Sequence, residues 1–123
     1  MNPERIVRDF CRSFETLDPQ KILVYLAPDC FYHNIPMEPL RGHAAIEGFF
    51  KEFLSGCTAG QFEIKALAVN GSTVLTERVD RFSLRDGRRI ELPVMGTFEL
   101  RSDGEISAWR DYFDLATWTR QMA

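Results

Sequence analysis

The sequence predicts an α+β fold, in which a curved, mixed and mainly antiparallel sheet wraps over three to four helices as a cone with a deep pocket. Up to Gly56 apolar residues recur mostly at helical spacing, whereas beyond it they alternate with polar residues as in half-buried strands. The second half also contains Asn70-Gly71, Asp86-Gly87 and Asp103-Gly104, dipeptides that favour the positive φ angles of hairpin turns. We therefore expect helices first and an antiparallel sheet after them.

The first half of the chain is expected to contain three helices. Residues 3–17 have an amphipathic pattern, and Pro3 suits the first turn of a helix. Asp18 is a natural N-cap for a short second helix whose apolar residues are Ile22, Leu23 and Leu26, and HAAIEGFFKEFL from His43 is the third. A short strand at 30–34 separates the last two helices.

The second half of the chain is expected to form four strands and a final helix. The strands are predicted at 61–69, 73–84, 89–100 and 105–113, and the helix carries Leu115, Trp118 and Met122. Apolar residues occur on both faces of 89–100, with Pro93 and Met95 opposite the larger apolar set. Because the helices can cover only one face of the sheet, we expect a second subunit to cover the other face as a homodimer.

Length and composition narrow the class of protein. With 123 residues, 1–123 is expected to be a single domain, and a net charge of −3 without a basic stripe argues against binding nucleic acid. No apolar run is long enough to span a membrane, and the N-terminal residues lack the apolar core of a signal peptide. Three cysteines without CxxC spacing indicate neither a disulfide framework nor a metal site, which favours the reducing cytoplasm.

Aromatic residues are numerous for a chain of this size, with ten phenylalanines, three tyrosines and two tryptophans. They either make up a bulky core or line a cavity for an apolar small molecule. We expect the cavity walls to include Phe14, Phe53, Phe62, Phe82, Met95, Phe113 and Trp118.

Polar residues interrupt strand faces that are otherwise apolar. Strand alternation places Arg78 and Asp80 on one face, Asp111 between bulky neighbours in the last strand, and Tyr32 and Asn34 together in the first. Such groups are costly in a core unless they meet other polar groups. If the three faces converge, these residues form a polar cluster at the floor of an aromatic pocket.

Alternation also permits simpler interpretations of the same residues. Arg78 and Asp80 could form a surface pair, and Asp111 could bond its neighbour in the chain. Tyr32 could be a half-buried core residue and Asn34 a turn residue. The spacing does not decide between these alternatives.

At these positions the sequence resembles the limonene-1,2-epoxide hydrolase family, within the nuclear-transport-factor-like and SnoaL-like superfamily of cone folds. The matching stretches are Tyr32-His33-Asn34-Ile35-Pro36, Thr76-Glu77-Arg78-Val79-Asp80 and Trp109-Arg110-Asp111-Tyr112-Phe113-Asp114-Leu115. The resemblance implies a one-step, cofactor-free hydrolysis of a small apolar epoxide to a vicinal diol. It does not carry over limonene as the substrate, because the candidate wall residues are bulkier and more aromatic.

The resemblance also implies a role for each polar residue. Asp111 would be the general base, Asp80 the general acid and Arg78 the bridge between them, while Tyr32 and Asn34 would help Asp111 to hold the attacking water. An arginine suits the bridge because its planar fork contacts two carboxylates at once.

The cone fold admits two further functions. One is a ketosteroid isomerase-like or polyketide cyclase-like proton transfer, with Asp111 as the base and Tyr32 as the donor; Arg78 would then have no clear task. The other is a non-catalytic, dimeric module that binds a small molecule.

Overall fold

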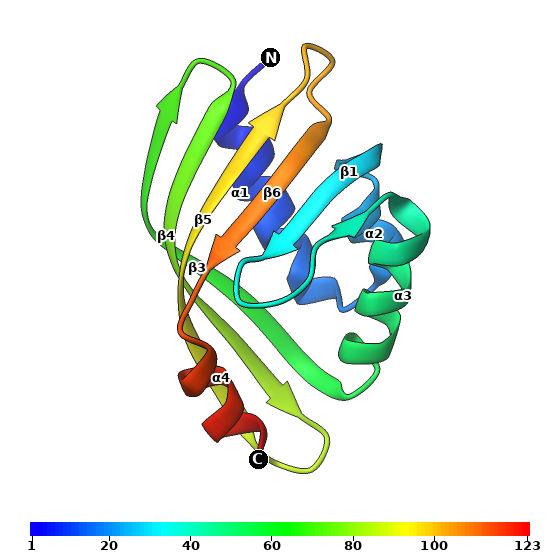
Figure 1. Cartoon of the computed structure of the whole chain (residues 1–123), viewed down its shortest axis with the longest axis vertical. Coiled ribbons are helices and arrows are strands. Elements are labelled where there is room, and N and C mark those ends of the chain that lie inside the picture. Colours follow the sequence, from blue (N-terminus) through cyan, green and yellow to red (C-terminus); the bar gives the residue numbers. More distant parts are fainter.

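The computed structural model describes residues 1–123 as one six-stranded sheet with helices packed against it (Figure 1). In chain order the elements are α1 (Pro3–Ser13), the 3-10 helix η1 (Phe14–Thr16), α2 (Pro19–Leu23), β1 (Leu26–Asn34), β2 (Leu40–Arg41), α3 (His43–Leu54), β3 (Cys57–Asn70), β4 (Thr73–Leu84), β5 (Arg89–Leu100), β6 (Ile106–Tyr112) and α4 (Leu115–Met122). The strand order is β2-β1-β6-β5-β4-β3, and only β1 and β6 pair in parallel. The predicted α+β class with a mixed, mainly antiparallel sheet is confirmed.

The hairpin turns form where the sequence predicts them. Gly71, Gly87 and Gly104 all have positive φ, at 62°, 93° and 90°. They connect β3 to β4, β4 to β5 and β5 to β6, so the last four strands follow one another as an antiparallel meander. Because its register is fixed by these tight turns, the meander sets which side chains face the interior.

Several element boundaries differ from the prediction: β1 and β3 begin four residues earlier than expected, and β2 was not predicted. The helix expected over 3–17 ends at Ser13, continues as η1, and stops at Leu17 in the left-handed region with φ 56°. Leu26, expected in the second helix, begins β1 instead and pairs with Ile106 of β6. Helical spacing at Leu26 was misleading because a buried strand presents the same apolar residues.

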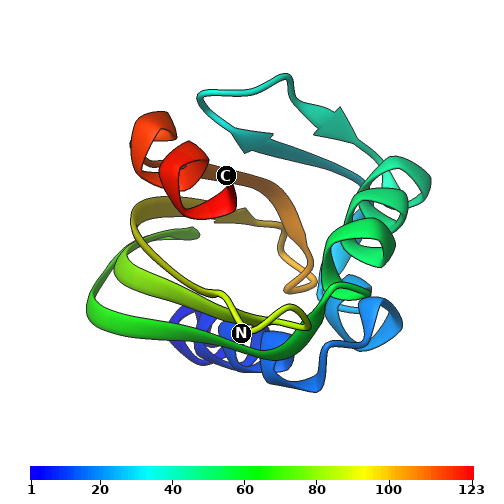
Figure 2. The ribbon, with the colours of Figure 1, turned by 90° about the horizontal axis from the view of Figure 1, so that it is seen from below.

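The core lies between the helices and one face of the sheet. Phe10 of α1 is fully buried there and contacts Phe98 and Trp109, with ring centroids 5.9 and 5.0 Å away. Figure 2 shows the sheet curling, with α3 and α4 on opposite sides of the curled end. Helix α4 contributes no buried residue, and its Gln121 side chain bonds both the N–H and the C=O of Glu91 on β5.

The opposite face of the sheet carries exposed apolar side chains. Leu75 is 48% exposed, Met95 53% and Tyr112 50%. Met95 is the register partner of Glu77 on β4 and of Tyr112 on β6, so it lies between them. Leu75 pairs with Thr97 and is therefore diagonal to Met95. None of the helices has both the length and the apolar composition needed to cross a membrane.

Candidate active site

The polar residues singled out in the sequence converge at the inner face of the sheet. Arg78 and Asp80 of β4 and Asp111 of β6 are 1%, 5% and 3% exposed. Tyr32 and Asn34 come from β1, whose parallel pairing with β6 aligns Asn34 with Asp111. Three strands that are far apart in the sequence thus bring five polar side chains to one place.

Arg78 joins the two carboxylates. Its Nε donates to Asp80 Oδ1 at 3.0 Å, and its Nη2 donates both to Asp80 Oδ2 and to Asp111 Oδ2 at 2.9 Å. The guanidinium also lies over the rings of Phe62 and Phe98, 4.9 and 5.8 Å from their centroids. The alternative of a surface pair is therefore wrong, because the ion pairs are enclosed by aromatic rings.

Asp111 is fixed from two sides. Its Oδ2 accepts from Arg78, and its Oδ1 accepts a hydrogen bond of 2.8 Å from the indole Nε1 of Trp109. Trp109 is itself stacked against Tyr32, with ring centroids 4.0 Å apart and planes within 12°. The neighbouring Arg110 faces the other way and pairs with Glu99 at 2.6 Å, so it does not bind Asp111.

Tyr32 and Asn34 are bonded to each other beside Asp111. Asn34 Nδ2 donates to the Tyr32 hydroxyl at 2.9 Å, which leaves the hydroxyl proton and Asn34 Oδ1 without protein partners. Both residues line the pocket. Burial, and then the negative charge of Asp111, raise the pKa of Tyr32, so its hydroxyl stays neutral and can donate.

The charges of the cluster favour retention of one proton. One guanidinium and two ionised carboxylates would leave a net negative charge in an apolar interior, which is costly. Burial raises the pKa of Asp80 to about 6, the charge of Asp111 adds to this effect, and Arg78 opposes it. Burial alone would lower the pKa of Arg78, but the two carboxylates raise it well above its usual value. We infer an arginine that stays charged beside Asp80, a carboxyl that keeps its proton up to about pH 6.

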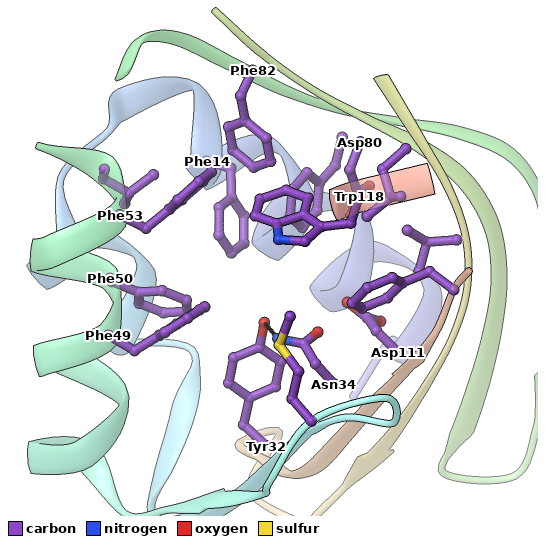
Figure 3. A pocket seen from close by; sticks show the side chains of 16 residues that line it. Phe14, Tyr32, Asn34, Phe49, Phe50, Phe53, Asp80, Phe82, Asp111 and Trp118 are labelled. Carbon is purple, nitrogen blue, oxygen red and sulfur yellow. Dashed lines mark hydrogen bonds between the residues drawn. The ribbon is translucent and has the colours of Figure 1, made fainter. Parts of the chain in front are cut away.

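The cluster lies at the floor of a cavity of about 190 Å³ (Figure 3). Of the 16 lining residues 13 are hydrophobic, and the other three are Asn34, Asp80 and Asp111. In Figure 3 the rings of Phe49, Phe50 and Phe53 on α3 lie across the cavity from the two aspartates. The cavity therefore has apolar walls and all its polar groups at one end.

Six of the seven expected wall residues line this cavity: Phe14, Phe53, Phe62, Phe82, Phe113 and Trp118. Met95 does not, so its assignment to the cavity was wrong. It lies on the outer face because Leu92 and Val94, which do line the cavity, fix the alternation of β5. The prediction missed further lining residues, namely Met37, Phe49, Phe50, Leu54, Leu92 and Val94.

Sequence signals for the missed residues did exist. Phe49, Phe50, Phe53 and Leu54 follow the three-to-four-residue spacing of one face of α3. Their assignment to the cavity depends on how α3 is placed over the sheet, which the spacing alone does not reveal. No three or more His, Cys, Asp or Glu side chains are grouped so that they could hold a metal ion.

Comparison with known proteins identifies relatives. The family model described as "Limonene-1,2-epoxide hydrolase catalytic domain" matches residues 1–123. Epoxide hydrolase EphG of Mycobacterium tuberculosis (strain ATCC 25618 / H37Rv) is 30% identical over 109 residues, which are 89% of this chain and 71% of EphG.

Solved structures agree with this relationship. The structure of an M. tuberculosis LEH-like epoxide hydrolase superposes with a TM-score of 0.82 at 28% identity, covering 97% of this chain and 87% of that one. The epoxide hydrolase/cyclase-like enzyme SalBIII has a TM-score of 0.83 at 16% identity, with 94% and 92% covered. At that identity SalBIII is similar in fold alone.

The raised pKa of Asp80 predicts a pH dependence of stability. The pKa is 3.8 for an ordinary Asp and about 6 in the folded chain, so this group stabilises the fold fully below about pH 4. That contribution is lost as pH rises through 6, because the unfolded chain releases the proton more readily. Asp80→Asn cannot titrate at this position, so its free energy of unfolding should rise by about 2 kcal/mol relative to that of the parent between pH 4 and 7.

Urea unfolding of both proteins at several pH values measures this difference. Glu52→Gln, which removes an exposed carboxyl from α3, is the control for the loss of one carboxyl. A difference between Asp80→Asn and the parent that stays constant over this range would contradict the raised pKa.

Proposed function

We propose that this chain, which belongs to the limonene-1,2-epoxide hydrolase family, adds water to an apolar epoxide in one step to give a vicinal diol. The observation that carries the proposal is the pair of buried carboxylates held by one guanidinium at the polar end of an apolar cavity. Opening an epoxide needs a nucleophile at carbon and a proton at oxygen. One ionised and one protonated carboxyl supply the base and the acid.

Asp111 is the proposed base, and Tyr32 and Asn34 are the proposed water-binding groups. A water placed among them donates one proton to Asp111 and the other to Asn34 Oδ1, and accepts the Tyr32 hydroxyl proton. Its remaining lone pair is then free to attack carbon. The hydrogen bond between Asn34 and Tyr32 supports this assignment, because it leaves unused the two groups that the water requires.

Asp80 is the proposed acid. As the water oxygen bonds to carbon, the strained carbon–oxygen bond breaks and the leaving oxygen takes the proton of Asp80, while Asp111 takes a proton from the water. The two carboxyls share one proton before and after the step, so the buried charge does not change. Return of a proton to Asp80 from Asp111 prepares the next cycle, and Arg78, bonded to both, keeps the pair at a fixed spacing.

The proposed substrate is a small uncharged epoxide. The cavity of about 190 Å³ is below the roughly 300–1,000 Å³ of pockets that hold drug-sized ligands. Its walls offer no partner for a charged group, since the only charged lining residues are the two aspartates. An epoxide with one ring or a short apolar substituent suits such a space, and we propose that no cofactor takes part.

A proton-transfer enzyme and a binding module are the competing functions. Asp111 and Tyr32 could serve as base and donor for an enolisable ketone, and cyclase-like proteins share the fold. That reaction gives no task to the bond network between Arg78 and Asp80. A panel of epoxides assayed alongside an enolisable ketosteroid separates the three functions, because a binding module turns over neither.

We further propose that residues 1–123 act as one domain in the cytoplasm and that it pairs as a homodimer. The dimer would form through the outer patch, which we define as Leu75, Met95 and Tyr112. Met95 and Tyr112 are half-exposed register partners, and the half-exposed Leu75 lies diagonally from Met95 on β4, which supports this proposal. The three cysteines, all buried free thiols, accord with a reducing compartment.

Removing either carboxyl should abolish hydrolysis. Asp80→Asn and Asp111→Asn each lose the acid or the base, a contribution of about 10²–10⁴-fold to the rate. Diol formation measured by chromatography, with circular dichroism to check folding, tests both variants. Asp86→Asn, in an exposed turn, should keep the parental rate. If a folded Asp80→Asn or Asp111→Asn variant keeps that rate too, its residue does not belong to the reaction.

The outer patch predicts the mass in solution. Light scattering should give twice the chain mass of 14.2 kDa, and Met95→Glu should shift it toward the monomer by placing a charge in the interface. Lys21→Glu, on the exposed side of α2, is the control and should leave the mass unchanged. A parent protein that scatters as a 14.2 kDa particle removes the dimer.

A further inference from the structure

Arg78 reaches its second carboxylate across an intervening strand. It lies on β4 and Asp111 lies on β6, with β5 between them in the sheet. Neighbouring strands are about 4.8 Å apart, so β4 and β6 are separated by roughly twice that distance. The ion pair of 2.9 Å between Arg78 and Asp111 therefore spans the face of β5.

The point of crossing is Gly96. The register pairs Thr76 of β4 with Gly96 and Gly96 with Asp111 of β6, so the three residues form one row across the sheet. A Cβ atom on Gly96 would approach Asp111 Oδ1 to 2.5 Å and come even closer to Arg78 Nη1. Gly96 is not among the glycines with positive φ, so its backbone does not require glycine. What requires glycine is the space taken by the ion pair.

Thr76 fixes the guanidinium over that space. Its hydroxyl accepts from Arg78 Nη1 at 3.1 Å and donates to the backbone carbonyl of Gly96 at 3.1 Å. Thr76 is 1% exposed, so no bulk water replaces this acceptor if it is lost. With Nη1 held by Thr76, the other edge of the guanidinium points at both aspartates.

We propose that Thr76 and Gly96 are positioning residues, which together form the seat that holds Arg78 against both carboxylates. Gly96 supplies the space for the crossing, and Thr76 sets the orientation of the guanidinium within it. Neither residue lines the cavity, so they act through Arg78 rather than on a substrate. The expected effect on turnover rests on the proposed function, whereas the position of Arg78 against the two carboxylates does not.

The first readout does not depend on any substrate. Infrared spectra recorded across pH follow the carbonyl band of the protonated Asp80 carboxyl, which is assigned by its loss in Asp80→Asn. The other titratable groups around the pair are Cys11 of α1, Tyr32 of β1 and Arg78 itself. Burial raises the pKa of Cys11 to about 12 and raises that of Tyr32, so neither ionises in the range measured.

Thr76→Val keeps the shape of the side chain and removes the acceptor, whereas Thr76→Ser keeps the hydroxyl. We expect the band of the valine variant to titrate at higher pH than in the parent, because a displaced guanidinium stabilises the ionised pair less. The serine variant should titrate as the parent does. With an epoxide as substrate, Thr76→Val should lower kcat at least 10-fold with KM little changed, and Thr76→Ser should restore it.

Gly96→Ala tests the crossing space. We expect a loss of about 100-fold in kcat and the same upward shift of the carboxyl titration, since the added methyl group displaces Arg78 or Asp111. Gly48→Ala is the matched control, because nothing lies within 4 Å of the added methyl group there.

If the parent hydrolyses no epoxide, the proposed function is wrong. The infrared titration still tests whether Thr76 and Gly96 position Arg78. If Gly96→Ala does not fold, the pair Thr76→Val and Thr76→Ser decides. Parental titration and parental kcat in folded Thr76→Val would overturn the proposal.

Discussion

The rest of the site is arranged to satisfy the buried ion pairs of Arg78 with Asp80 and Asp111. Three charges enclosed by aromatic rings need a hydrogen-bond partner for each donor and acceptor. Thr76 and Trp109 provide the remaining partners, and no buried side-chain nitrogen or oxygen atom in the structure lacks one.

Buried ion pairs of this kind contribute little to the free energy of unfolding. Replacing buried ion pairs by apolar residues of similar volume is often neutral or stabilising by about 1–4 kcal/mol. The network therefore makes more sense as chemistry, because it keeps two carboxyls at a fixed spacing while only one of them holds a proton. The fold alone does not specify this chemistry, since proteins similar only in fold include cyclase-like enzymes.

Alternation along single strands predicted which polar residues share a face, whereas their union in one site was implied by the resemblance to the epoxide hydrolase family. Because Arg78 and Asp80 are two residues apart in β4, they face the same side in any sheet arrangement. The parallel pairing of β1 with β6 could not be predicted in this way, although it is what aligns Asn34 with Asp111. Pairing between distant strands depends on tertiary packing, and local spacing carries no information about it.

The errors have different origins. Met95 was assigned to the cavity because of its size and chemistry, although two-residue alternation from Val94 already places it outside. Phe53 of α3 was assigned to the cavity but Phe49 and Phe50 were not, because helical spacing alone does not distinguish a core face from a cavity wall. The importance of Gly96 could not be predicted from the sequence, because the space above it is filled by the side chains of Arg78 and Asp111 from the two neighbouring strands.

In the proposed reaction water attacks the epoxide carbon directly, and the carboxyls act only on protons. Both oxygens of each aspartate already accept hydrogen bonds, which weakens either carboxylate as a nucleophile. A single turnover in heavy-oxygen water, with mass spectrometry of the diol and of the protein, tests this most directly. We expect label in the diol and none in the protein, whereas label in Asp80 or Asp111 would show that a carboxylate attacks the epoxide.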